Sequence, residues 1–118
     1  MKPENKRTVH RVINVFGSKN QKMQSLEELM ELQSALFENI HRETDNLKNI
    51  VEEIADVEIM LVQLKEIFNI EPKEIEEIQD YKLRRLDHTI EKYLAKHQNE
   101  NSSQKQEIHI DRETSNGR

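Results

Sequence analysis

The sequence predicts an all-α protein built as an antiparallel bundle of about four helices. Its 118 residues include only two Gly and two Pro and are rich in the helix-favouring residues Glu, Lys, Leu, Ile and Gln. Apolar residues recur at helical spacing along most of the chain. Hydrophobic residues make up only 34% of the composition, a thin supply for a chain too small to bury much surface. We therefore expect oligomerisation to complete the bundle.

The first two helices are expected on either side of Gly17. Residues 3–16 start with a Pro, which suits a first helical turn, and Gly17 can adopt the left-handed conformation that ends a helix. Ser18 and Gln21 have the spacing of a capping box. The second helix is therefore expected to start at Ser18 and to run to about Arg42.

Two further helices follow a polar break at residues 44–46. The third helix has apolar residues alternately three and four apart: Leu47, Ile50, Ile54, Val57, Leu61, Leu64 and Phe68. This spacing is that of a heptad seam and predicts a central helix of the bundle. A fourth helix is expected from Pro72 to about Lys96. The segment 98–118 is polar and is expected to be a disordered tail, so residues 1–97 are predicted to form the only domain.

Two pairs of carboxylates stand beside the apolar stripes of the second and third helices. Glu28 and Glu31 form one pair and Glu53 and Asp56 form the other. Residues three apart lie about 60° apart around a helix axis, so each pair shares a face. If the helices pack together, the four carboxylates converge, and a divalent cation offsets their repulsion. The alternative is that both pairs lie on solvated helix faces, where this spacing occurs freely in a chain with 23 acidic residues.

The donor types favour Mg²⁺, with Mn²⁺ as a second option, because hard oxygen ligands are present and Cys is absent. A di-iron bundle needs two Glu-x-x-His motifs from different helices. The expected helices contain one, from Glu38 to His41. Iron is therefore the weaker hypothesis.

Lys82 and Arg85 form a cationic pair on the fourth helix. Lys82 interrupts an apolar stripe that otherwise runs from Ile75 to Leu94. Its stem can pack on apolar neighbours while its head reaches water. Beside four carboxylates, the pair could instead hold phosphate oxygens.

Composition limits the location and partners that we expect. No apolar N-terminal run resembles a signal peptide, no segment is apolar enough to cross a membrane, and the formal net charge is −5. We expect a cytoplasmic protein that binds neither membranes nor nucleic acid, because a nucleic-acid binder usually carries a basic face.

The acidic motif resembles that of the MazG-like all-α nucleoside triphosphate pyrophosphohydrolases. The sequence reads Glu-Glu-Leu-Met-Glu at 27–31, then 21 intervening residues, then Glu-Ile-Ala-Asp at 53–56. The segment from Tyr81 to Leu86 is similar to the basic Lys-x-x-Arg segment of that family. The likeness covers about residues 10–95. The chain has no Trp, although some members use aromatic residues around the base.

The resemblance implies a Mg²⁺-dependent enzyme that cleaves a nucleoside triphosphate to the monophosphate and pyrophosphate. It assigns metal binding and catalysis to Glu28, Glu31, Glu53 and Asp56, and substrate contacts to Gln21, Lys82 and Arg85. It also implies a homodimer or homotetramer. A non-enzymatic helical protein-interaction module is the alternative, supported by the heptad seam and the charged surface.

Overall fold

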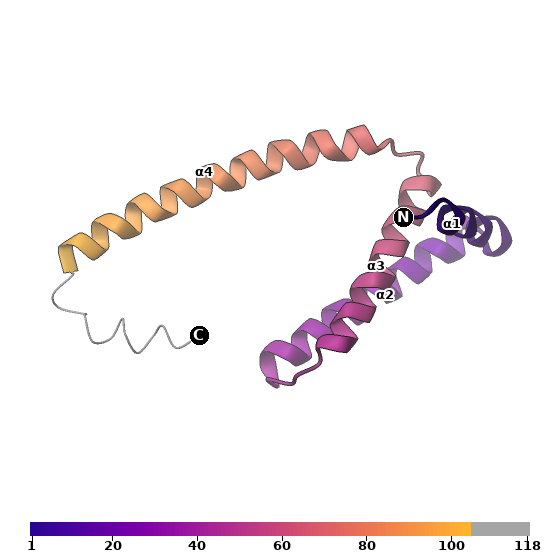
Figure 1. Ribbon diagram of the computed structural model, residues 1–118, viewed down its shortest axis with the longest axis horizontal. Coiled ribbons are helices and arrows are strands. Elements are labelled where there is room, and N and C mark those ends of the chain that lie inside the picture. The colour runs from indigo at the N-terminus through magenta and orange to yellow at the C-terminus, as the bar shows by residue number, and fades with distance from the viewer. Residues whose placement is uncertain (105–118) are drawn as a thin grey trace. The chain divides into compact units, whose positions relative to one another are not determined.

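The computed structural model of the protein describes residues 1–104, with side chains described through residue 100. These residues form four helices and no strand, which confirms the all-α prediction (Figure 1). The helices are α1 (Pro3–Phe16), α2 (Ser18–His41), α3 (Leu47–Ile67) and α4 (Pro72–Gln104). The starts at Pro3, Ser18 and Pro72 agree with those expected from the sequence.

The chain divides into two compact units, and the domain predicted over residues 1–97 stays a prediction. The first unit is Met1–Glu71, which holds α1, α2 and α3, and the second is Pro72–Arg118, which holds α4. The boundary coincides with the Pro that opens α4. Among the described helices, none combines the length and the apolar character that crossing a bilayer requires.

Helices α2 and α3 form an antiparallel hairpin, which is the main packing of the first unit (Figure 1). Near the turn, the Asn46 side chain donates a hydrogen bond to the carbonyl of Ala35 at 3.0 Å. Further along, the Ser25 hydroxyl contacts the Met60 sulfur at 3.5 Å. As residue numbers fall on α2 they rise on α3, so this register places residue 28 near residue 56.

Helix α1 meets α2 at a junction of a single residue. Gly17 has φ 89° and ψ 148° and is both the C-cap of α1 and the N-cap of α2. The predicted capping box is wrong, because no side chain caps α2. Ser18 is already the first helical residue, and the backbone N–H of Gln21 donates to the Gly17 carbonyl at 3.1 Å.

The core is small, and half of its buried residues are polar. Its apolar members are Val9, Ala35 and Val57, and its polar members are Gln21, Ser25 and Gln63. The heptad seam predicted for α3 is only partly buried. Its members Leu47, Ile54, Leu61 and Phe68 are exposed, because the face of α3 toward α2 is rotated to include Glu53, Val57, Met60 and Gln63.

Helix α4 is longer than expected. It continues to Gln104 instead of ending near Lys96, so residues 98–104, predicted as disordered, are helical. These residues contain neither Pro nor Gly, and nothing in them stops a helix once it has started. The remainder of the predicted tail, residues 105–118, lies outside the described residues.

Candidate metal centre

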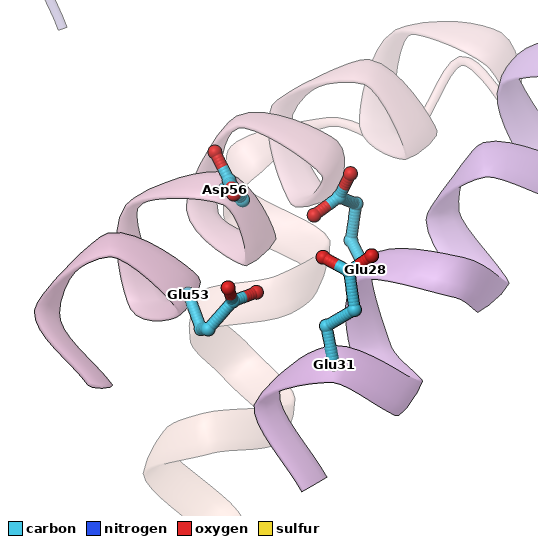
Figure 2. Close-up of side chains that lie close together, drawn as sticks. All are labelled: Glu28, Glu31, Glu53 and Asp56. Atoms are coloured by element: carbon cyan, nitrogen blue, oxygen red, sulfur yellow. The ribbon is translucent and has the colours of Figure 1, made fainter. Parts of the chain in front are cut away.

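Four carboxylates converge between α2 and α3. Glu28 and Glu31 project from α2, and Glu53 and Asp56 from α3, toward the same space (Figure 2). One oxygen from each carboxylate can be chosen such that all four lie within 4.8 Å of one another. The spacing of three on each helix and the antiparallel register together produce this arrangement. The structure therefore joins the two acidic pairs that the sequence predicted to meet.

The crowding of negative charge perturbs two of these groups. The Gln24 amide donates to Glu28 Oε1 at 3.0 Å and lowers the pKa of Glu28. Desolvation and the charges of Glu31 and Asp56 act in the opposite direction, and the net pKa of Glu28 is raised above its ordinary value of 4.5.

Glu31 is perturbed mainly by its partner on the other helix. The negative charge of Glu53 is the largest cause, followed by desolvation, and the pKa of Glu31 is raised above 4.5. Because like charges disfavour ionisation, the protein without metal holds these carboxylates under electrostatic strain. A cation between them would relieve it.

Two oxygens of the cluster are buried and lack a hydrogen-bond partner. They are Glu28 Oε2 and Glu53 Oε2, one from each helix. Leaving a buried acceptor without a partner costs free energy, and the cost is greater for a charged group. Each of the two residues therefore keeps an acceptor available for a ligand that approaches from the space between the helices.

The donor set fits a hard divalent cation. All four groups are carboxylates, and oxygen is the donor that Mg²⁺, Mn²⁺ and Ca²⁺ prefer in proteins. His41, the histidine of the single Glu-x-x-His motif, does not belong to the cluster. Its ring packs against Phe37 with the ring centroids 4.1 Å apart.

The predicted substrate residues lie in different places. Gln21 is buried on α2, seven residues before Glu28 and therefore two turns away on the same face. Lys82 and Arg85 are exposed on α4, in the second unit, whose position relative to the first is not determined (Figure 1). The Arg85 guanidinium lies 5.8 Å from the Tyr81 ring centroid. The assignment of these three residues to substrate stays a prediction.

Sequence reasoning missed two glutamines. Gln24 donates a hydrogen bond to Glu28 and so orients it. The spacing could have revealed this contact, because residues four apart are neighbours on the same side of a helix. Gln63 is 2% exposed, and its Oε1 is buried without a partner. It follows Asp56 by seven residues, so it lies on the same face of α3.

Comparisons of this chain with protein-family models, with curated proteins and with solved structures find no match.

Proposed function

We propose that this protein is a Mg²⁺-dependent nucleoside triphosphate pyrophosphohydrolase, with Mn²⁺ as an alternative metal. The observation that carries the proposal is the convergence of Glu28, Glu31, Glu53 and Asp56 within 4.8 Å. Their order and spacing resemble the motif of MazG-like enzymes. The substrate is an NTP or dNTP, and the products are the monophosphate and pyrophosphate.

The four carboxylates would hold the metal, and the two buried unpartnered oxygens are the first groups that it would satisfy. Bound Mg²⁺ neutralises phosphate charge and lowers the pKa of a coordinated water. Gln24 fixes the Glu28 carboxylate through Oε1, which leaves Oε2 directed to the ligand. Restricting a ligand side chain before binding reduces the entropy lost when the ligand arrives.

A carboxylate of the cluster that is not fully engaged with the metal would take up a proton from the attacking water. We assign this step to Glu31, which is exposed on α2 and lies beside Glu53. Its raised pKa belongs to the protein without metal, because a bound cation offsets the charge of Glu53 that is the main cause of the shift.

Lys82 and Arg85 are proposed to contact the phosphates. They lie three residues apart on α4 and therefore share one face of that helix. Two cations on one face can bind adjacent phosphate oxygens of a triphosphate.

The protein is further proposed to act as a homodimer or homotetramer. The outer stripe of α3 supports this proposal, and we define the stripe as four residues spaced seven apart: Leu47, Ile54, Leu61 and Phe68. Their exposed fractions are 66%, 43%, 44% and 55%. A continuous line of large apolar side chains on one helix face is typical of a surface that another protein covers.

The same exposure favours a second candidate function, a non-enzymatic helical interaction module. Helix α4 also exposes apolar residues at helical spacing, among them Ile78, Leu86, Ile90 and Leu94. A module of this kind has no need of the acidic cluster. It predicts that Mg²⁺ leaves thermal stability unchanged and that no nucleotide is hydrolysed.

The test is a pyrophosphate-release screen with the full-length protein over canonical and modified NTPs and dNTPs. We expect release from at least one nucleotide with Mg²⁺ or Mn²⁺ and none after chelation with EDTA. Glu53→Gln removes one ligand charge and is expected to abolish release. Glu58→Gln removes an exposed carboxylate of the same helix outside the cluster and is the matched control. Full activity in Glu53→Gln would contradict the metal assignment.

A further inference from the structure

The turn between α2 and α3 is tied to α2 by one side chain. Asn46 is the N-cap residue of α3, and its Nδ2 donates a hydrogen bond to the backbone carbonyl of Ala35 at 3.0 Å. Ala35 is 3% exposed, so this carbonyl lies where little water reaches it. The hydrogen bond therefore joins the start of α3 to a buried position of α2.

The amide of Asn46 is used in an unusual way for an N-cap residue. An N-cap asparagine ordinarily accepts a hydrogen bond at its side-chain oxygen from a backbone N–H in the first turn of its own helix. In α3 no side chain makes such a bond. Asn46 Oδ1 accepts instead from Asn39 Nδ2 at 3.1 Å, and Asn39 Nδ2 also donates to the Thr44 carbonyl at 3.3 Å. Both ends of the Asn46 amide thus bind α2, at the expense of the first turn of α3.

The hydrogen bond between Asn46 and Ala35 is in register with the acidic cluster. Ala35 follows Glu28 by seven residues on α2, and Asn46 precedes Glu53 by seven residues on α3. Seven residues make about two turns, so each lies on the same face as its carboxylate and about 10 Å from it along the axis. Because the two helices are antiparallel (Figure 1), the register that sets residue 35 opposite residue 46 also sets residue 28 opposite residue 53.

The register needs a restraint at this site. Glu28 and Glu53 hold carboxylate oxygens within 4.8 Å of each other (Figure 2), and their like charges favour any sliding or turning of α3 that separates them. The apolar packing that opposes such movement is small, since Ala35 and Val57 are the buried apolar residues of the two helices. A hydrogen bond resists both movements, because its donor and acceptor must stay within about 3.2 Å and close to linear.

We propose that Asn46 is a positioning residue for the metal centre: through its hydrogen bond to the Ala35 carbonyl it holds the register of α3 on α2 that sets Glu53 opposite Glu28. The inference rests on the proposed function, in which these carboxylates hold the metal. Asn39 supports this role, because its bond to Oδ1 orients the Asn46 amide with Nδ2 toward Ala35.

Capping is the alternative role for Asn46, and Asn46→Asp separates the two. Aspartate is as good an N-cap residue as asparagine, but its carboxylate has no Nδ2 to donate to the Ala35 carbonyl. If Asn46 acted only as a cap, Asn46→Asp would behave as the unmodified protein does. We expect it to behave as Asn46→Ala does, both in thermal unfolding and in metal binding.

The first measurement is a double-mutant cycle between Asn46 and Glu53, made by thermal unfolding of the full-length protein in EDTA. Glu53→Gln alone relieves repulsion and should raise the melting temperature by about 4–8 °C. With Asn46→Ala present, the carboxylates are no longer held together, so we expect about half of this rise or less. Two substitutions about 10 Å apart that share no partner are otherwise additive. Gly17→Ala perturbs the junction of α1 and α2 and is the matched control, in which the full rise should persist.

The second measurement is the affinity for Mn²⁺, read without nucleotide from the electron paramagnetic resonance signal of the free ion. We expect Asn46→Ala and Asn46→Asp to bind Mn²⁺ about three- to tenfold more weakly than the unmodified protein, because the arrangement that presents all four carboxylates is less populated. Gly17→Ala destabilises the fold by another route and should keep the unmodified affinity. The titration is made well below the melting temperature of every variant, so that unfolding does not contribute.

Equal rises from Glu53→Gln in the unmodified and Asn46→Ala backgrounds would overturn the inference. Unchanged Mn²⁺ affinity in Asn46→Ala, or unmodified behaviour of Asn46→Asp, would do the same. The proposed function is judged separately by nucleotide hydrolysis. Coupling between Asn46 and Glu53 in a protein that hydrolyses no nucleotide would contradict the enzyme and support the positioning role, whereas hydrolysis in a protein with additive substitutions would do the reverse.

Discussion

Removing one charge from the acidic cluster should have opposite effects on stability with and without metal. Glu53→Gln is the most informative change, because Glu53 faces the carboxylates of α2 and one of its oxygens is buried without a partner. In the absence of metal the substitution relieves repulsion and should stabilise the fold. In the presence of Mg²⁺ it removes a ligand and should abolish the stabilisation that the ion provides.

The size of the metal-free effect follows from the distance between Glu53 and the other carboxylates of the cluster, of which one oxygen each lies within 4.8 Å. Two unit charges at such a distance repel each other by about 1 kcal/mol in bulk water and by about 3 kcal/mol at an effective dielectric constant of about 20. Glu53 is partly accessible to solvent, so the lower figure applies. A gain of about 1 kcal/mol raises the melting temperature of a domain of this size by about 4–8 °C.

The assay is thermal unfolding followed by circular dichroism at neutral pH and low salt, with EDTA or with saturating Mg²⁺. The unmodified protein should gain about 2.7 kcal/mol when Mg²⁺ is present at a hundredfold its dissociation constant, and Glu53→Gln should gain little. Glu58→Gln changes the net charge equally and should behave as the unmodified protein does. A melting temperature of Glu53→Gln that falls in EDTA, or that still rises fully with Mg²⁺, would contradict the assignment of Glu53 to the metal site.

Three further predictions concern pH, the helix junction and the hairpin turn. The pKa of Glu31 is raised in the folded protein, so the stability that this group contributes is present below pH 4.5 and is lost as pH rises through the raised pKa. Without metal, Glu31→Gln should therefore gain stability relative to the unmodified protein as pH rises to neutral. A difference in melting temperature that stays constant at all pH values would contradict this. Gly17→Ala should destabilise the protein by about 1–3 kcal/mol in urea unfolding, because φ 89° strains any residue with a Cβ, even where no other atom lies within 4 Å of that Cβ. An unchanged urea midpoint would show that the backbone at this junction relaxes. Asn46→Ala removes the hydrogen bond to the Ala35 carbonyl and the one from Asn39, and should cost about 1–2 kcal/mol by the same assay, whereas a neutral effect would mean that water replaces both bonds.

The helices and the acidic cluster were within reach of sequence reasoning because both depend on local spacing. Pro72 and Gly17 mark helix boundaries through backbone restrictions that act at single residues. Spacing of three places Glu28 beside Glu31 on one face, and a short turn between α2 and α3 leaves an antiparallel hairpin as the natural arrangement. The convergence of four carboxylates then requires only the correct register.

The rotation of α3 was not predictable from hydrophobicity. The apolar seam through Leu47 and Leu61 is the more regular pattern, yet the buried face is the neighbouring one, which carries Glu53 and Gln63. A rule that assigns the most apolar face to the core fails where the core also contains a polar site. The polar composition after Gln98 similarly suggested disorder, but nothing in residues 98–104 stops the helix.

If the four carboxylates support cleavage of a nucleoside triphosphate, the products that phosphorus NMR identifies are the monophosphate and pyrophosphate. The full-length protein is incubated with Mg²⁺ and the nucleotide that it turns over fastest, beside Glu28→Gln and Glu58→Gln. We expect monophosphate and pyrophosphate in equal amounts from the unmodified protein and from Glu58→Gln, and unchanged triphosphate from Glu28→Gln. Diphosphate with inorganic phosphate, turnover that survives in Glu28→Gln, or intact triphosphate in every sample would contradict the proposed cleavage.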